Sequence, residues 1–331
     1  QGWVEMSKTL MSLADDADLI LTSTSYQEVA ANVAEYHGIP LAALHYFPAR
    51  ANSRIVPIPV PALVVRCGWS VIDWVHWRLV KEAEDAQRHE LGLPRATAPS
   101  VRRIVESEAL EIQAYDELLF PGLTEEWGGK RPFVGAITMG LATDTDDEVA
   151  RWIAAGKPPI YFGFGSMPVE SPADTIAMIS AVCEELGERA LVCSGMWNVD
   201  DIGHADHVKV VRTVNHAAVF PMCRVVVHHG GSGTTAAGIR AGVPTLILWV
   251  AADQPIWANQ IKLLKVGTAQ RFSRTNRQSL LVALRSVLAP QYVTRAREVA
   301  SQMTKPAISV ATAADLLEDA VRPSLARRSR R

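Results

Sequence analysis

The segment with the clearest chemical meaning is His228-His229-Gly230-Gly231-Ser232-Gly233-Thr234-Thr235. It follows the Val-rich run Arg224–His228, which is typical of a buried strand, and it precedes a segment with helical character. Glycines in such a turn let the backbone approach a ligand closely, while the first turn of a helix presents unpaired N–H groups and a positive dipole end. Thr234 and Thr235 add hydroxyls, and His229 adds an imidazole N–H. The segment therefore predicts a phosphate-binding site.

Competing kinds of site fit this segment less well. No Gly-Lys-Ser/Thr sequence follows the glycines, so a P-loop is excluded, and the G-x-G-x-x-G dinucleotide fingerprint cannot be laid over them. Adjacent His228 and His229 would point to opposite sides of a strand, which makes them poor metal ligands. We do not predict that His204 and His207 complete a metal-ligand set with this segment. We therefore predict no metal site.

Three further segments follow predicted strands and carry weaker signals. Asp253-Gln254 comes after the predicted strand Thr245–Val250, and a carboxylate beside an amide suits recognition of vicinal hydroxyls. Asp before a helix is also an ordinary N-cap, however. Ser166 lies in the turn Gly163–Met167, and Val214 begins the segment Val214-Asn215-His216. Taken singly, these two segments are uninformative.

The elements that would position these residues alternate between strand and helix, which predicts an α/β fold with parallel sheets. Ligands bind such sheets beyond the carboxyl ends of the strands, where the segments above fall. In the second half we predict strands at Pro159–Phe164, Ala190–Ser194, Val208–Val211, Arg224–His228 and Thr245–Val250, and helices at Pro172–Leu186, Gln254–Leu264, Asn276–Leu288, Gln291–Met303 and Pro306–Val321. In the first half we predict strands at Asp18–Thr22, Ile39–Leu44, Tyr115–Phe120 and Arg131–Val134, and helices at Tyr26–Tyr36 and Ser70–Leu91.

Three tryptophans, Trp69, Trp74 and Trp77, lie near the start of the Ser70–Leu91 helix. They can form an apolar wall for a hydrophobic ligand, or they can simply pack in the core. Core packing is the interpretation that we favour.

Bulk composition narrows the class of protein. A chain of 331 residues, 48% hydrophobic and 21% charged, is long enough for two globular domains. The 33 basic and 35 acidic residues give a net charge of -2, which disfavours a nucleic-acid binder. Four cysteines without CxxC spacing indicate reduced thiols in a cytoplasmic protein. No apolar run is long enough for a membrane span, and no signal-peptide pattern opens the chain.

Taken together, the motif segments resemble the family-1 glycosyltransferases of GT-B fold, above all the bacterial antibiotic, glycolipid and sterol enzymes. The matching segments are GFGSM (Gly163–Met167), VNHAAVFP (Val214–Pro221), VVHHGGSGTTAAGIRAGVP (Val226–Pro244) and ADQPIWANQIKLLKVG (Ala252–Gly267). In the first half, Leu21–Pro48 is similar to mycobacterial-type members. The resemblance implies two Rossmann-like domains facing a cleft, with the N-terminal one incomplete. We expect a partial acceptor domain at 1–139, a linker at 140–158, a donor domain at 159–321 and a basic disordered tail at 322–331.

The resemblance also implies the chemistry. It implies inverting transfer of a hexose from a UDP- or TDP-sugar to a hydroxyl of a lipophilic or glycolipid acceptor, without metal or cofactor. It implies that His229 and Thr234 contact the diphosphate and that Ser166 lies near it. The backbone at Val214 would hold the nucleotide base, and Asp253 and Gln254 would bind the sugar hydroxyls. The remaining expected donor-binding residues are Gly230, Gly231, Ser232 and Gly233.

The chain departs from the family pattern in one respect. The family's general base is a His or Asp in a Gly-rich loop after the first strand of the acceptor domain, and we expect that base upstream of Gln1. His45 is a candidate base, or otherwise a loop or core histidine. The alternative function is therefore a non-catalytic nucleotide-sugar-binding protein. A nucleotide-sugar epimerase is less favoured, because this chain shows no acidic proton-transfer set near the glycines. A nicotinamide dehydrogenase remains a further alternative. We expect no nucleic-acid partner and at most peripheral membrane contact, for which the Arg-rich end Arg322–Arg331 is one candidate.

Overall fold

The computed structural model describes residues 2–55, 61–138, 140, 142–165, 167, 169–197 and 205–328. The chain forms two compact units. Unit 1 consists of Gln1–Ile137 together with Thr304–Arg331, and unit 2 consists of Thr138–Met303. No helix among the described residues combines the length and the apolar character that crossing a bilayer requires.

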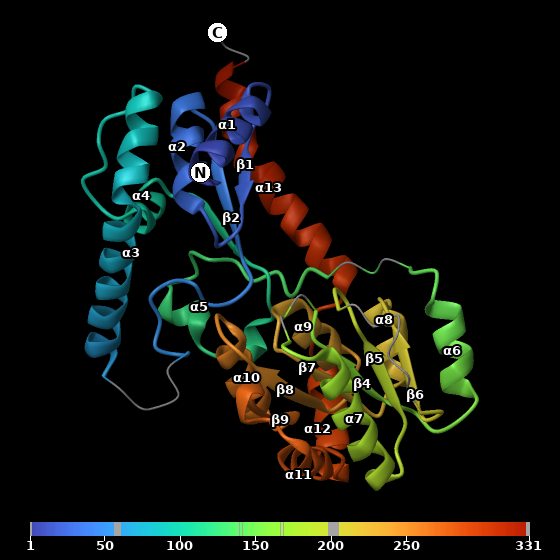
Figure 1. Cartoon of the computed structure of the whole chain (residues 1–331). Coiled ribbons are helices and arrows are strands. Elements are labelled where there is room, and N and C mark those ends of the chain that lie inside the picture. Colours follow the sequence, from blue (N-terminus) through green and yellow to red (C-terminus); the bar gives the residue numbers. More distant parts are fainter. Residues whose placement is uncertain are drawn as a thin grey trace. The chain divides into compact units, whose positions relative to one another are not determined.

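Unit 2 contains a six-stranded parallel sheet in the order β6-β5-β4-β7-β8-β9 (Figure 1). Its strands are β4 (Ile160–Gly163), β5 (Ala190–Cys193), β6 (Val208–Val211), β7 (Val225–His228), β8 (Thr245–Trp249) and β9 (Gly267–Arg271). Because β4 and β7 are adjacent, the loops that follow them emerge side by side at the carboxyl edge of the sheet. The α/β fold with parallel sheets that the sequence predicted is confirmed.

Helices cover both faces of this sheet, which explains why its strands are apolar on both sides. In β4, Ile160 and Phe162 point into a core shared with helices α7 (Pro172–Leu186) and α11 (Arg277–Val287), whereas Tyr161 points into a second core on the other face. The helices of unit 2 are α6 (Asp146–Ala154), α7 (Pro172–Leu186), α8 (His216–Val219), α9 (Ser232–Arg240), α10 (Gln254–Leu263), α11 (Arg277–Val287) and α12 (Pro290–Ala300), with short 3-10 turns η2 (Phe220–Met222) and η3 (Phe272–Arg274).

Unit 1 contains a three-stranded parallel sheet in the order β1-β2-β3. Its strands are β1 (Ile20–Thr22), β2 (Leu41–His45) and β3 (Leu110–Gln113). Its helices are α1 (Gly2–Ala14), α2 (Gln27–His37), α3 (Ala62–Glu90), α4 (Ser100–Glu106), α5 (Leu123–Glu126) and α13 (Pro306–Arg328), with a 3-10 turn η1 (Glu117–Leu119).

The compact units differ from the domain boundaries that we expected. Helix α13 belongs to unit 1, since Ala313 packs with Ile112 of β3 and with Val134. The same helix continues to Arg328, through most of the segment expected to be a disordered tail. The expected linker contains α6, which begins with three acidic residues that favour a helix N-terminus.

Two expectations for strands were wrong. The segment expected as a strand at Tyr115–Phe120 forms the 3-10 turn η1 and its flanks, while the strand itself lies earlier, at β3. The segment Arg131–Val134 contributes only an isolated bridge between Phe133 and Gln113. Strand β9 was not expected, because its sequence GTAQR lacks the apolar run of the other strands.

Candidate functional site

The turn between β7 and α9 forms an uncapped helix N-terminus at the carboxyl edge of the sheet. Helix α9 begins at Ser232, and its N-cap residue Gly231 provides no side-chain cap. A helical hydrogen bond runs from the Thr235 N–H to the Gly231 carbonyl at 2.9 Å. The Thr235 hydroxyl donates to the same carbonyl, also at 2.9 Å, so it is not free for a ligand. The N–H groups of the first helical turn therefore face outward at the positive end of the helix.

Gly230 has a backbone conformation and surroundings that only glycine fits. Its φ is +96°, and a Cβ added there would lie 2.8 Å from Ile247 Cγ2 and 3.2 Å from Gln254 Cβ. The turn is thus pressed against the segment that follows β8, which places the expected phosphate and sugar residues next to each other.

The buried side chain of His228 supports this turn by a hydrogen bond to its backbone. Its side chain is fully buried, and its Nδ1 accepts a hydrogen bond from the Gly230 N–H at 3.0 Å. Nε2 consequently carries the proton, and it has no partner among the described residues. Burial holds the pKa of His228 well below its usual range, with the neighbouring histidines acting in the same direction. The sequence analysis placed His228 at the start of the phosphate-binding segment without giving it a task of its own, and the structure shows that it supports the turn.

His229 lies between two glycines. A Cβ on Gly231 would come 2.8 Å from His229 Nε2, and a Cβ on Gly165 would come 3.1 Å from His229 Cε1. His229 Nδ1 is buried without a partner among the described residues. Burial lowers the pKa of His229, while a hydrogen bond with the Gly163 backbone and the charge of Asp253 oppose this shift. The ring is therefore neutral at pH 7, and buried polar atoms left unpaired in this way are typical of a ligand-binding site.

The two glycines Gly231 and Gly233 provide a matched pair of substitutions. Gly231→Ala should push the His229 ring from its place, whereas Gly233 has nothing within 4 Å of an added Cβ. Neither glycine has a positive φ, so backbone strain is the same for both. We expect Gly231→Ala to weaken nucleoside diphosphate binding about tenfold, the effect of losing one charge-assisted hydrogen bond. Gly233→Ala keeps its backbone N–H and its Cβ meets no protein atom within 4 Å, so it should lose much less affinity than Gly231→Ala. Calorimetric titration measures both, and equal affinities would contradict this role of the glycine.

Asp253 and Gln254 lie in the segment that follows β8, and the side chains of both already make hydrogen bonds within the protein. Asp253 Oδ2 accepts from the indole of Trp257 at 3.0 Å. Gln254 Oε1 accepts from the N–H groups of Val250 at 2.7 Å and Ala251 at 3.2 Å. These bonds fix the Gln254 carboxamide and leave its NH₂ group as the donating end. The arrangement fits recognition of hydroxyl groups.

Val214 and Ser166 are the two remaining residues that we expected at the donor site. Val214 is buried at the carboxyl end of β6, where its N–H interacts with the thiol of Cys193. The next residue, Asn215, donates its N–H to Asp146 Oδ1 at 2.9 Å, so α6 fixes this loop. Ser166 lies outside the described residues. Among the residues that the structure describes, no three His, Cys, Asp or Glu side chains gather closely enough to hold a metal ion.

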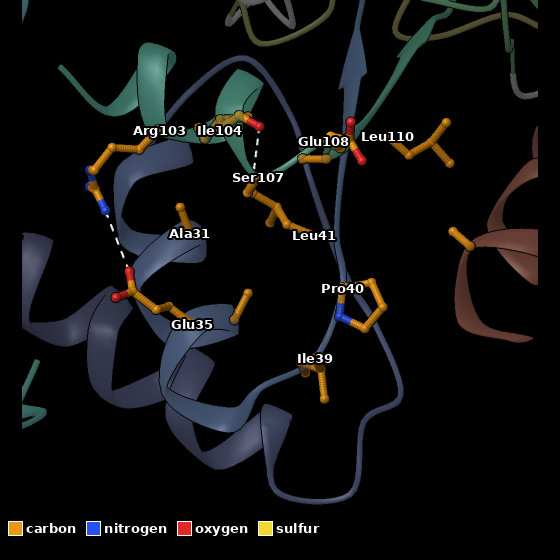
Figure 2. A pocket seen from close by; sticks show the side chains of 13 residues that line it. Ala31, Glu35, Ile39, Pro40, Leu41, Arg103, Ile104, Ser107, Glu108 and Leu110 are labelled. Carbon is orange, nitrogen blue, oxygen red and sulfur yellow. Dashed lines mark hydrogen bonds and ion pairs between the residues drawn. The ribbon is translucent and has the colours of Figure 1, made fainter. Parts of the chain in front are cut away.

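Two hollows lie at different edges of their sheets. In unit 2, a cavity of about 560 Å³ opens between the N-terminus of α7 and the ends of β8 and β9, with Val250, Arg271 and Phe272 among its lining residues. In unit 1, a cavity of about 400 Å³ lies where β2 and β3 begin, between Leu41, Leu110 and the Glu35–Arg103 ion pair (Figure 2). Ligands of parallel sheets bind at the carboxyl edge, so only the unit 2 cavity lies on the expected side.

His45 is a core histidine. Its side chain is fully buried, with Nε2 3.0 Å from the Gln27 amide and Nδ1 3.3 Å from the Gln113 amide. Arg50 donates to both Gln27 and Glu111 beside it. Burial lowers the pKa of His45 to about 3, and the charges of Arg50 and Arg131 act in the same direction. A side chain held in this way cannot reach an acceptor hydroxyl, so of the two alternatives that the sequence left open for His45, the core histidine is the one that the structure supports.

The buried His45 predicts a specific dependence of stability on pH. Below about pH 6.5 the unfolded chain binds a proton at His45, whereas the folded chain does not until the pH approaches 3. The free energy of unfolding should therefore fall as the pH is lowered through this window, by up to about 1.4 kcal/mol per pH unit. His45→Gln removes this contribution and leaves those of the other histidines. Urea unfolding of both proteins from pH 6.5 to 4 should show the steeper fall in the wild type; parallel profiles would contradict the assignment.

Comparisons with known proteins indicate the family of the chain. Residues 196–321 match the family model described as "Erythromycin biosynthesis protein CIII-like, C-terminal domain". An uncharacterized glycosyltransferase of Mycobacterium tuberculosis (strain ATCC 25618 / H37Rv) is 65% identical over 323 residues, which cover 97% of this chain and 78% of that protein. A sterol 3-beta-glucosyltransferase of Arabidopsis thaliana is 30% identical over 244 residues, 71% of this chain and 38% of that protein.

Solved structures show the same fold. The glycotransferase of kitacinnamycin superposes with a TM-score of 0.72 at 18% identity, over 96% of this chain and 80% of that one. The glycosyltransferase SsfS6 of Streptomyces sp. SF2575, solved in complex with thymidine diphosphate, superposes with a TM-score of 0.60 at 22% identity, over 95% of this chain and 74% of that one.

Proposed function

The chain belongs to the family-1 glycosyltransferases, and on this basis we propose that unit 2 binds a UDP- or TDP-sugar along the carboxyl edge of its sheet. We further propose that the enzyme transfers the hexose, with inversion and without a metal, to a hydroxyl of a lipophilic or glycolipid acceptor. The observation that carries the proposal is the uncapped N-terminus of α9 with His229 beside it. This arrangement offers N–H donors and a positive dipole end to a diphosphate.

The residues have separate tasks in this proposal. The first-turn N–H groups of α9 and the imidazole of His229 hold the diphosphate and stabilise the negative charge that grows on it as the bond to the sugar breaks. Asp253 and Gln254 orient the sugar through its hydroxyls, and the backbone at Val214 contacts the base of the nucleotide. The oxygen of the acceptor hydroxyl attacks the anomeric carbon from the face opposite the diphosphate, and the nucleoside diphosphate leaves, which inverts the configuration. The hydroxyl proton passes to a general base or to solvent water.

The lipophilic acceptor rests on a separate observation. Two relatives from Arabidopsis thaliana, 30% and 31% identical to this chain, are named sterol 3-beta-glucosyltransferases. A sterol or glycolipid hydroxyl is therefore the acceptor class that we propose to test first.

A transfer assay tests the proposal. The chain is incubated with α-linked UDP- or TDP-hexoses, a panel of sterols and glycolipids, and a chelator of divalent metals, and products are examined by NMR. We expect release of the nucleoside diphosphate and a β-linked product. An α-linked product would contradict inversion, and activity that needs an added metal would contradict the role of α9. Tight binding of the donor without any transfer would favour the non-catalytic alternative.

A further inference from the structure

The cavity of unit 2 borders the two segments that form the donor site, yet no described residue of the expected donor set lines it. Val250, one of its lining residues, donates its N–H to Gln254 Oε1 at 2.7 Å. The loop after β4 passes the His229 ring at Gly165 and reaches the cavity at Val169. A ligand in this cavity would therefore lie beside the segments that are proposed to hold the donor.

The walls of the cavity carry charges of both signs. Glu170 and Asp174 line it around the start of α7, and Arg271 lines it at the end of β9. Within the described part of the chain, no ion pair joins these three groups to one another or to any other residue. The guanidinium of Arg271 is nevertheless held in place, since it lies 5.6 Å from the ring centre of Trp249 on the adjacent strand. The three charged groups can thus meet a ligand without first breaking an ion pair.

Apolar side chains complete the lining. Met178 of α7 and Val250 contribute aliphatic surface, and Phe272 contributes an aromatic ring. Phe272 is fixed by an edge-to-face contact with Phe164, whose ring centre lies 5.6 Å away. Sites for small molecules combine an apolar lining with a few fixed polar groups in this way, and a volume of about 560 Å³ is typical of them.

The signs of the charges discriminate between classes of ligand. The two carboxylates would repel a phosphate or another anion, and the guanidinium of Arg271 would repel an organic cation. An uncharged sugar avoids both penalties, because each of its hydroxyls can donate to a carboxylate and accept from a guanidinium. Its C–H surface can pack on the ring of Phe272. The cavity therefore has the composition of a site for an uncharged saccharide.

We propose that this cavity binds an uncharged saccharide that belongs to the acceptor. The inference rests on the proposed function, and it narrows the acceptor to molecules that already carry a sugar, such as glycolipids, in preference to bare sterols. Asp253 and Gln254 are assigned to the hexose of the donor, so a second saccharide beside them comes from the other substrate. In this arrangement Glu170, Asp174 and Arg271 determine which acceptor is bound.

Saturation-transfer NMR of the full chain tests this inference, with methyl β-D-glucopyranoside and maltose as probes. Each titration is run with and without saturating UDP. Arg271→Met removes the guanidinium but keeps an unbranched stem over Trp249. Arg274→Met is the matched control, because Arg274 lies in the same turn η3, is exposed and does not line the cavity. Thermal unfolding checks that both variants are folded.

We expect both saccharides to bind with or without UDP, and we expect cyclohexanol, which has a ring but a single hydroxyl, to bind much more weakly. Arg271→Met should lower the affinity for the saccharides about fivefold, the effect of losing one net hydrogen bond. Arg274→Met should bind them as the wild type does. Equal affinities of the two variants, or no binding of either saccharide by the wild type, would overturn the inference.

Asp174→Asn provides a second readout from the other wall. It keeps the backbone N–H that donates to the Ser171 hydroxyl at 3.2 Å, but it removes one negative charge from the cavity. The wild type should bind glucuronate more weakly than methyl β-D-glucopyranoside, and Asp174→Asn should narrow this difference. Tighter binding of glucuronate than of the methyl glucoside by the wild type would contradict a site for uncharged sugars.

Calorimetry with UDP and UDP-glucose separates this inference from the proposed function. Absence of UDP binding would contradict the function proposed for unit 2, and the titrations without UDP would still decide whether the cavity binds a saccharide. Arg271→Met should bind UDP and UDP-glucose as the wild type does. A loss of affinity confined to UDP-glucose would show that the cavity holds the transferred hexose, and it would overturn the assignment to the acceptor.

Discussion

Replacing His229 by Ala is expected to weaken the binding of a nucleoside diphosphate by roughly 1.5–3 kcal/mol, about ten- to hundredfold, which is the scale of a hydrogen bond to a charged group. The imidazole is held between Gly165 and Gly231 and has little freedom to reorient. It therefore meets a phosphate oxygen without losing much conformational entropy. Isothermal titration calorimetry with UDP and TDP measures the loss, and an unchanged affinity for both would remove His229 from the site.

The same residue predicts how affinity changes with pH. Burial lowers the pKa of His229 in the free protein, and a bound diphosphate should raise it, because the negative charge favours the protonated ring. Affinity should therefore rise as the pH falls below 7. The phosphate also titrates in this range, so the informative quantity is the difference between wild type and His229→Gln. Identical pH profiles for the two proteins would contradict direct contact.

A change at Gln254 should separate recognition of the sugar from recognition of the nucleotide. Gln254→Glu keeps an oxygen that can accept from the Val250 and Ala251 N–H groups, but it removes the NH₂ donors. We expect this variant to lose at least tenfold in affinity for the intact donor, as for a buried hydrogen bond that is left unmade. Affinity for free UDP or TDP should change little, because the groups that bind the diphosphate lie in the β7–α9 turn. Calorimetry with matched pairs of donor and nucleotide measures both quantities.

The matched variant for this experiment is Gln254→Ala. It removes the acceptor as well as the donors, so the segment after β8 loses the bonds that fix it. Alanine keeps the Cβ of residue 254, but the Gly230 turn packs closely against this segment, so some loss of nucleotide binding is expected once the segment is no longer fixed. An equal loss of donor and nucleotide affinity in Gln254→Glu itself would contradict the assignment of Gln254 to the sugar.

The donor-side fold could be predicted from sequence because local and tertiary signals agree there. The strands β4, β5, β7 and β8 are short apolar runs followed by turn residues, and each is buried on both faces. The helix α7 has a Ser171 cap, a proline at its start and Gly187 after its end, all readable from the chain. The strand β9 was missed because packing against β8, rather than its own residues, decides its conformation.

Long-range packing explains the other differences. Nothing local distinguishes α13 from α12, yet α13 packs on β3 of unit 1, and the Thr304 N–H before it donates to Asp116 Oδ1 at 2.6 Å. The core role of His45 depends on two glutamines that are 18 and 68 residues away. Likewise, periodicity alone does not show which helix face remains uncovered, which is why Trp74 was assigned to the core although it is 53% exposed.

Amide chemical shifts give the sharpest view of how the diphosphate is held. A ¹⁵N-labelled sample is titrated with UDP or TDP in the presence of a chelator of divalent metals. The amides of Ser232, Gly233 and Thr234 should then show large shifts, as N–H groups at the start of α9 bind phosphate oxygens. Saturable binding that leaves these three amides unchanged would contradict the proposal that this helix N-terminus holds the donor.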